Sequence, residues 1–268
     1  MRRHHRPLIL GAAVTVGVLT ATVIPSAAAP SADRTTPKPT VVLVHGAFAD
    51  ASGWSGVVSR LRKAGYPVVA PANPLRGLQS DAGYISSLLG TIDGPKILVG
   101  HSYGGAVITE AAASVPEVKA LVYVAAFMPD KGELLSELAD RFPGSELLPA
   151  LEGLPDGAGH TDVAIKPDKF HDVFAGDLPR STTSVLAVSQ RPVSLAAFGS
   201  TAQAAAWRTI PSWFLVAKQD KTISPALERF QAKRAGSTTV EINSSHVAMM
   251  SHPDKVTSLI KSAAKSTR

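Results

Sequence analysis

The chain has 268 residues, of which 45% are hydrophobic and 18% charged, a composition that fits a packed globular unit and argues against disorder. Its formal charge of +6 falls to about +3 without Arg2, Arg3 and Arg6, because 24 basic residues then face 21 acidic ones. Basic runs with interleaved aromatic residues are absent, so nucleic acid is not an expected partner. The absence of cysteine excludes disulfides, thiol catalysis and thiolate metal sites.

Residues 1–29 are predicted to be a cleavable signal peptide. The three arginines precede an uncharged apolar stretch over residues 8–24, and Ala27-Ala28-Ala29 supplies the small-x-small pattern of a signal peptidase site. A retained membrane anchor is the alternative, because the apolar run is near the lower limit for a span. The cleavage pattern favours a secreted protein that has no membrane contact once the signal is removed.

A Pro-rich linker is expected over residues 30–39, and strand-like and helix-like stretches alternate after it, which predicts an α/β fold with a parallel sheet covered by helices. The strand candidates are short and almost continuously apolar, as strands buried on both faces require. They are Val41–Val44, Val68–Ala70, Lys96–Val99, Ala120–Val124, Trp213–Ala217 and Thr239–Ile242.

Helices are expected between these strands. Three show clear signals: an apolar stripe of Trp54, Val57, Val58 and Leu61 before Gly65; an N-terminal Ser224-Pro225 with a closing Gly236; and a stripe of Val256, Leu259, Ile260 and Ala263.

The alternation breaks over residues 129–207, which are rich in Pro, Gly and Asp and hold no convincing central strand. Because a structureless connection of that length is improbable in a compact domain, we expect a cap inserted into a core formed by residues 40–128 and 208–268.

The strongest motif is Gly100-His101-Ser102-Tyr103-Gly104, which follows a predicted buried strand and opens a helix of small residues. A serine hydroxyl is a poor nucleophile and must be presented on a sharp turn where a base can reach it. The crowded backbone of such a turn tolerates only small residues two positions on either side. Ser102 is therefore the candidate nucleophile.

Two backbone amides are candidates for an oxyanion hole. The first predicted strand ends in His45-Gly46-Ala47-Phe48, and a loop there can present an N–H opposite that of Tyr103 at the start of the next helix. We expect Ala47 and Tyr103 to be the donors, with Phe48 as the alternative to Ala47.

Asp220 and His246 each follow a predicted strand, at the sheet edge where parallel α/β sheets place their sites. His246 is the expected general base, and Asp220 would accept its hydrogen bond and hold its tautomer. Asp130, after the strand at 120–124, is the rival for the acidic role. The chain order Ser102, Asp220, His246 favours Asp220.

These segments resemble the α/β-hydrolase superfamily and, within it, the compact branch of plant methyl-ester esterases and hydroxynitrile lyases. The resemblance covers about residues 40–265 and implies a six-stranded core with a cap inserted after the strand at 120–124. Lyases of that branch carry a threonine at the position of Gly46 and a lysine at that of Val247. Both departures favour an esterase.

The sequence thus predicts a serine hydrolase that cleaves small-molecule carboxylic esters through an acyl-serine intermediate, without metal or organic cofactor. An amidase, a peptidase, an acyltransferase and a non-catalytic binding protein on the same scaffold remain alternatives. Phe48, Phe127 and Met128 are expected to line the substrate pocket, together with these apolar cap residues: Phe142, Leu147, Leu148, Phe170, Phe174 and Trp207.

Overall fold

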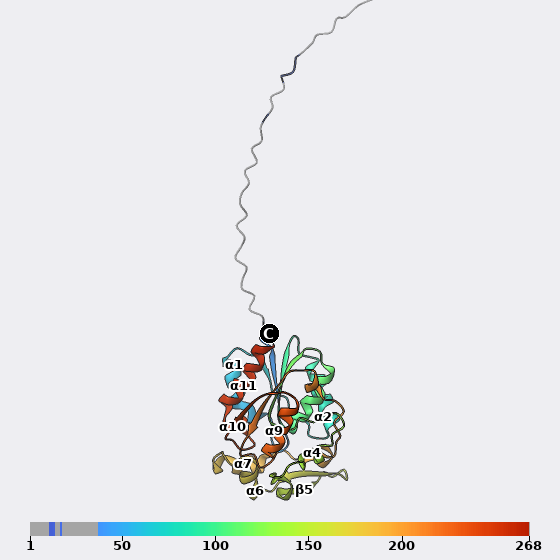
Figure 1. Cartoon of the computed structure of the whole chain (residues 1–268), viewed down its shortest axis with the longest axis vertical. Coiled ribbons are helices and arrows are strands. Elements are labelled where there is room, and N and C mark those ends of the chain that lie inside the picture. Colours follow the sequence, from blue (N-terminus) through green and yellow to red (C-terminus); the bar gives the residue numbers. More distant parts are fainter. Residues whose placement is uncertain (1–10, 14–16, 18–36, 268) are drawn as a thin grey trace, which may run out of the picture. The chain divides into compact units, whose positions relative to one another are not determined.

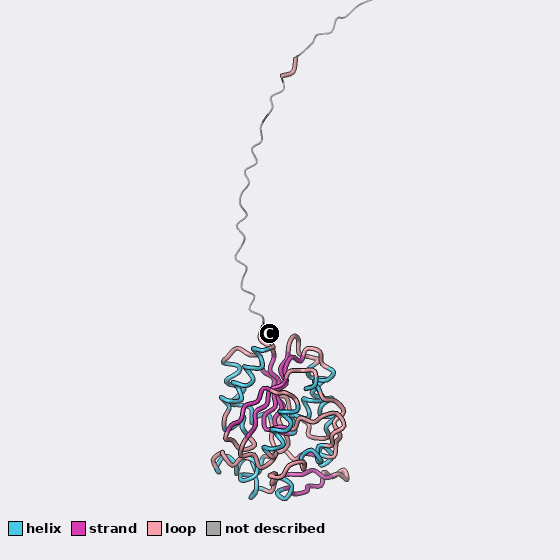
Figure 2. Tube along the Cα trace, viewed as in Figure 1, coloured by secondary structure: helices cyan, strands magenta, loops and turns pink. Residues whose placement is uncertain are grey.

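The computed structural model describes residues 11–13, 17 and 37–267. The predicted signal peptide and linker therefore lie almost entirely outside the described residues. Six parallel strands form the central sheet in the order β2-β1-β3-β4-β8-β9, which confirms the α/β class and all six strand positions (Figures 1 and 2). Their bounds are β1 Thr40–Val44, β2 Val68–Val69, β3 Lys96–Ser102, β4 Val118–Ala126, β8 Ser212–Ala217 and β9 Thr238–Ile242.

Burial differs between the middle and the edge of this sheet. Every residue of β3 and β8 is buried, as continuous apolar runs predict for strands covered on both faces. The edge strand β9 is mostly exposed and carries Thr238, Thr239 and Glu241, so its sequence reflects contact with solvent rather than full coverage.

Helices cover both faces of the sheet. On one face α1 (Ser55–Lys63) packs against α11 (Pro253–Ser266), and on the other α2 (Leu78–Leu89) packs against α3 (Tyr103–Ala111) (Figure 1). Helix α9 (Pro225–Arg234) packs on β8, and the short α10 (Ala248–Ser251) lies before α11. Short 3₁₀ helices occupy Ala51–Trp54, Ala112–Ser114 and Ala206–Arg208.

The predicted helix boundaries are confirmed by backbone geometry. Gly65 and Gly236 follow α1 and α9 with φ of 76° and 62°, values that favour glycine at a helix end. At the start of α9, the Ser224 side chain accepts a hydrogen bond from the Ala226 N–H at 3.3 Å. The apolar stripe of α11 is buried, with Val256, Ile260 and Ala263 fully inaccessible.

The cap lies between β4 and β8 and contains regular structure that the sequence did not predict. Its elements are α4 Leu135–Ala139, α5 Leu147–Ala150, β5 Leu151–Pro155, β6 Thr161–Ile165, α6 Pro167–Phe174, α7 Arg180–Ser189, β7 Val193–Ser194 and α8 Leu195–Phe198. Strands β5, β6 and β7 form an antiparallel sheet. Strand β5 lacks a strand signal because it is largely exposed and contains Gly153 and Pro155. The exact limits of core and cap stay predictions.

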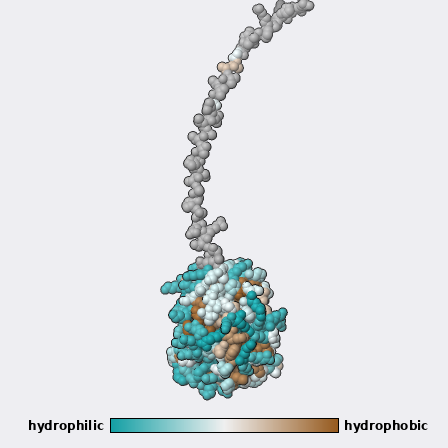
Figure 3. Space-filling view, in the orientation of Figure 1, coloured by the Kyte–Doolittle hydropathy of each residue, from teal (hydrophilic) through white to brown (hydrophobic). Residues whose placement is uncertain are grey.

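The outer surface is mainly polar. On the face seen in Figure 3, hydrophilic residues predominate and the apolar ones form small separate patches. Among the residues that the structure describes, no helix is both long and apolar enough to cross a membrane.

Candidate active site

Ser102 lies on a strained turn between β3 and α3. Its φ of 54° and ψ of −127° fall in a region that L-residues rarely adopt. Positive φ outside glycine occurs among the described residues at Phe48, Leu75, Ser102 and Ala125. Ser102 and Ala125 belong to the carboxyl-terminal ends of β3 and β4, and Phe48 and Leu75 lie in the loops that follow β1 and β2. Backbone strain is thus concentrated at one edge of the sheet, where functional sites commonly hold it.

The glycines around Ser102 are required by space. A Cβ atom on Gly100 would lie 2.5 Å from the Gly104 carbonyl oxygen, and one on Gly104 would lie 2.5 Å from the Val44 oxygen. A Cβ on Gly46 would lie 2.6 Å from Ser102 Cβ. The chain can therefore bring β1, the serine turn and α3 into direct backbone contact only with glycine at these positions.

The two predicted oxyanion donors are free to bind a ligand. Within the described part of the chain, the N–H groups of Ala47 and Tyr103 donate no hydrogen bond, whereas the Phe48 N–H donates to the Arg191 carbonyl at 3.1 Å. Because the Phe48 N–H is already hydrogen-bonded, Ala47 is the better candidate for the second donor of the oxyanion hole. Tyr103 also begins α3, where unpaired amides and the helix dipole favour negative charge.

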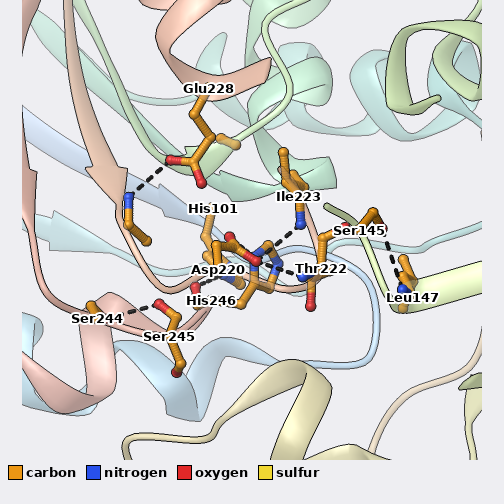
Figure 4. A network of polar contacts seen from close by, with 12 residues as sticks. His101, Ser145, Leu147, Asp220, Thr222, Ile223, Glu228, Ser244, Ser245 and His246 are labelled. Carbon is orange, nitrogen blue, oxygen red and sulfur yellow. Dashed lines mark hydrogen bonds and ion pairs between the residues drawn. The ribbon is translucent and has the colours of Figure 1, made fainter. Parts of the chain in front are cut away.

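Asp220 and His246 meet in the interior. The His246 Nδ1 lies 2.5 Å from Asp220 Oδ2, and both side chains are inaccessible to solvent (Figure 4). The second oxygen of Asp220 accepts the N–H groups of Thr222 at 2.6 Å and Ile223 at 2.9 Å. An ionised Asp220 requires the ring proton on Nδ1, which leaves Nε2 free to accept a proton.

The loop that carries His246 is tied to the serine turn. His101 Nε2 donates to the His246 carbonyl oxygen at 2.9 Å, and the two rings lie 4.6 Å apart. Burial, together with the nearby His246, holds the pKa of His101 well below 6.5, so this ring stays neutral. His246 Nε2 is buried and has no hydrogen-bond partner among the described residues. Catalytic hydrogen bonds commonly tighten only when substrate binds.

The rival acid is placed elsewhere. Asp130 forms a bidentate ion pair with Arg208 and accepts the Lys131 N–H at 2.8 Å. Asp220, and not Asp130, thus contacts the candidate base. The catalytic roles of Ser102, Asp220 and His246 remain predictions, but the fold brings the last two into contact and links their loop to the turn of the first.

Two supporting groups were not predicted from the sequence. His45 Nε2 accepts the Asn73 N–H at 2.9 Å, and the Asn73 side chain donates to the His45 carbonyl at 3.0 Å, which anchors the loop before Ala47. In the turn between α6 and α7, the Asp177 carboxylate accepts the Ser245 N–H at 3.1 Å, the Ser244 hydroxyl at 3.1 Å and the Ser245 hydroxyl. Partial burial opposes ionisation of Asp177, but these hydrogen bonds lower its pKa below the usual value.

Two cavities lie near this edge. One of about 50 Å³ is lined by Phe48, Phe170 and Phe174 among others. A second, of about 230 Å³, is bordered by Phe127 from the core and by these cap residues: Ser136, Ala139, Asp140, Ser145, Leu147, Leu148, Leu151, Leu195 and Phe198, with Thr222 completing it.

The other predicted lining residues contact neither cavity. Met128 is fully buried, with its main chain bonded to Gln231 and Arg234. Phe142 packs on Phe230, and the Trp207 indole donates to the Pro129 oxygen at 2.8 Å. Among the described side chains, no group of three or more His, Asp or Glu is arranged to hold a metal ion.

Comparison with known proteins identifies the family. A model of the alpha/beta hydrolase family matches residues 41–259, which is most of the chain. The chain belongs to this family. The match confirms the resemblance seen in the sequence and agrees with the six-stranded sheet and inserted cap.

Several proteins named as esterases or hydrolases are similar to this chain. A carbendazim hydrolyzing esterase from Nocardioides sp. is 37% identical over 110 residues, which is 36% of this chain and about half (46%) of that esterase. A pyrethroid hydrolase from Sphingobium wenxiniae is 26% identical over 243 residues, or 82% of this chain and 85% of that protein. The solved structure of polyneuridine aldehyde esterase has a TM-score of 0.73 at 20% identity, covering 84% of this chain and 99% of its own, a likeness of fold.

Proposed function

We propose that this alpha/beta hydrolase cleaves carboxylic esters through an acyl-serine intermediate, with Ser102 as the nucleophile and His246 as the general base. The observation that carries the proposal is the buried Asp220–His246 pair, in which His246 Nε2 has no hydrogen-bond partner among the described residues. The loop that carries His246 is hydrogen-bonded to His101 of the serine turn. The similar proteins named as an esterase and a pyrethroid hydrolase support ester cleavage.

The chemistry proceeds in two halves. Ser102 Oγ attacks the ester carbonyl carbon while His246 Nε2 takes the hydroxyl proton, and Asp220 stabilises the imidazolium through Nδ1. The N–H groups of Ala47 and Tyr103 bind the negative oxygen of the tetrahedral intermediate. The alcohol leaves with the proton from Nε2. Water then attacks the acyl-serine, again with His246 as base, and releases the carboxylic acid.

The 230 Å³ cavity supports an apolar acyl or alcohol group in the substrate. Two of its lining residues bond to residues of the site: the Phe127 N–H donates to the Ser102 carbonyl at 3.1 Å, and the Thr222 N–H donates to Asp220. Leucine and phenylalanine side chains form much of its wall. Small esters with an apolar chain or ring are therefore the expected substrates.

Replacing the nucleophile tests the proposal. Ser102→Ala should lower kcat for a short-chain nitrophenyl ester by roughly 10⁶, because no other group can form the acyl intermediate. The exposed Ser59 on α1 offers a matched control, and Ser59→Ala should keep full activity. Undiminished hydrolysis by a folded Ser102→Ala variant, checked by circular dichroism, would overturn the assignment.

A matched pair of substrates distinguishes ester cleavage from the amidase alternative. An ester and an anilide with the same acyl group should differ in kcat/KM in favour of the ester. Equal or greater turnover of the anilide would assign the same residues to amide cleavage instead.

A further inference from the structure

Glu228 is a buried acid directly behind the candidate catalytic pair. It lies on α9, its side chain is inaccessible to solvent, and its Oε2 accepts the Ala217 N–H at 3.0 Å. Figure 4 shows its carboxyl extending from α9 toward Asp220. The other oxygen, Oε1, has no donor within the described part of the chain.

When two carboxyl groups are neighbours inside a protein, the pKa of one of them rises, because like charges repel at short range and burial removes the water that would screen them. Asp220 and Glu228 differ in what surrounds them. Asp220 accepts three donors, from Thr222, Ile223 and His246, whereas Glu228 accepts one. The ionised form is therefore better stabilised on Asp220, and the proton belongs on Glu228.

We propose that Glu228 is a positioning residue that stays protonated at neutral pH and donates its hydroxyl hydrogen bond to the Asp220 carboxylate. This bond gives Glu228 Oε1 its partner and adds a fourth donor to the Asp220 carboxylate. The inference rests on the proposed function for its catalytic consequence, but the protonation itself can be measured without any substrate.

The charged surroundings agree with this assignment. Burial and then the neighbouring Asp220 raise the pKa of Glu228 well above 4.5. Within the described part of the chain, the other charged or titratable groups that act on this pair are His246, which bonds to Asp220, and Arg229 on α9 itself. The Arg229 guanidinium is exposed and forms an ion pair with Glu241 of β9 at 2.7 Å, so it does little to neutralise a charge on Glu228.

Infrared difference spectroscopy at neutral pH tests the protonation directly. Subtracting the spectrum of Glu228→Gln from that of the native protein should reveal the carbonyl stretch of a protonated carboxylic acid. Glu241→Gln is the matched control, since it removes an exposed, ion-paired carboxylate and should reveal only a carboxylate band. A carboxylate band in the Glu228 difference would overturn the proposal.

Stability against pH gives a second readout. An acid that is neutral in the folded protein but ionises near pH 4.5 in the unfolded chain destabilises the fold increasingly as pH rises above that value. Glutamine has no such linkage. The Tm of Glu228→Gln relative to the native protein should therefore increase over the pH interval that begins at 4.5 and extends through neutrality. A relative Tm that falls over this interval would mean that Glu228 is ionised and stabilising.

Kinetics test the positioning role. Glu228→Leu removes the donor to Asp220 and should lower kcat by about tenfold, the effect expected for one hydrogen bond to a charged group. Glu228→Gln retains both a donor and an acceptor and should restore most of that loss. The acid limb of the kcat/KM profile should move to higher pH in the leucine variant. An Asp220 carboxylate that has lost one hydrogen-bond donor stabilises the protonated imidazole of His246 more strongly.

The outcomes separate the two proposals. An acid band together with no ester turnover by the native protein would refute the proposed function and leave the protonation of Glu228 standing. Normal ester turnover together with a carboxylate band in the Glu228 difference spectrum would refute the protonation of Glu228 and leave the proposed function standing. If Glu228→Leu fails to fold, the glutamine variant still decides, because a glutamine variant with its acid limb moved to lower pH would show that a negative charge had been removed.

Discussion

The carboxyl edge of the central sheet and the cap are built in different ways. At the sheet edge, glycines allow backbone to touch backbone, and a Cβ on Gly46 or Gly104 would meet atoms at 2.6 and 2.5 Å. In the cap, elements are short and large apolar side chains remain in solvent, with Leu148 72% and Val188 79% exposed. We therefore expect the core to hold the proposed chemistry in one geometry and the cap to influence which substrate is accepted.

After the loss of Ser102 itself, the largest effect on kcat is expected from another residue of the core. Asp220→Asn removes the charge that holds His246 in its Nδ1–H tautomer, and kcat should fall by about 10⁴. Thermal unfolding measured alongside should show a folded protein. Loss of activity in a folded Asp130→Asn variant, with Asp220→Asn unaffected, would return the acidic role to the rival residue.

A smaller but still large loss of activity is expected when one methyl group is added beside the nucleophile. Gly46→Ala places a Cβ against Ser102 Cβ and the His101 carbonyl, and displacement of the nucleophile should lower kcat by about 10². Gly153→Ala on β5 of the cap is the matched control, because its Cβ would meet only Thr161 Cγ2 at 3.4 Å. Similar losses in both variants would contradict the contrast between a close-packed core and a tolerant cap.

The contact between the two regions should matter less than the core itself. Asp177→Ala removes the cap carboxylate that binds Ser244 and Ser245 beside His246, so the base loop loosens and kcat should fall about tenfold. Asp172→Ala, on the exposed side of α6, provides the control. Steady-state kinetics in which the two variants behave alike would remove Asp177 from the site.

The cap wall should show the smallest effect. Leu147→Ala shortens one side of the 230 Å³ cavity and should raise KM for esters with longer acyl chains by about threefold, with kcat almost unchanged. Val188→Ala, exposed on α7, should change neither constant. A fall in kcat without a change in KM would show that Leu147 acts on the chemistry and not on binding.

Much of the core and its site was predictable because their signals are local. A buried strand, a sharp turn and a helix start occupy consecutive residues around Ser102, and the strand before Asp220 carries the same apolar signature. The strand before His246 is mostly exposed, and its signal is the run of Thr and Val residues that favour a strand. Parallel strands end at one edge, so residues distant in the chain could be assigned to one site. The antiparallel sheet of the cap was missed, since the exposed β5 with Gly153 and Pro155 has no comparable pattern.

The sequence by itself determined the sheet, the serine turn and the order of the three candidate catalytic residues. Only the tertiary structure decided that the Phe48 N–H is bonded to the Arg191 carbonyl while the Ala47 N–H has no partner among the described residues. It also decided that Asp177 bonds to the loop of His246 and that Glu228 is buried on the Ala217 N–H. The physical reason is that strand and turn formation depends on neighbours along the chain. Hydrogen bonds such as that from Ser245 to Asp177, 68 residues apart, depend on how whole elements pack.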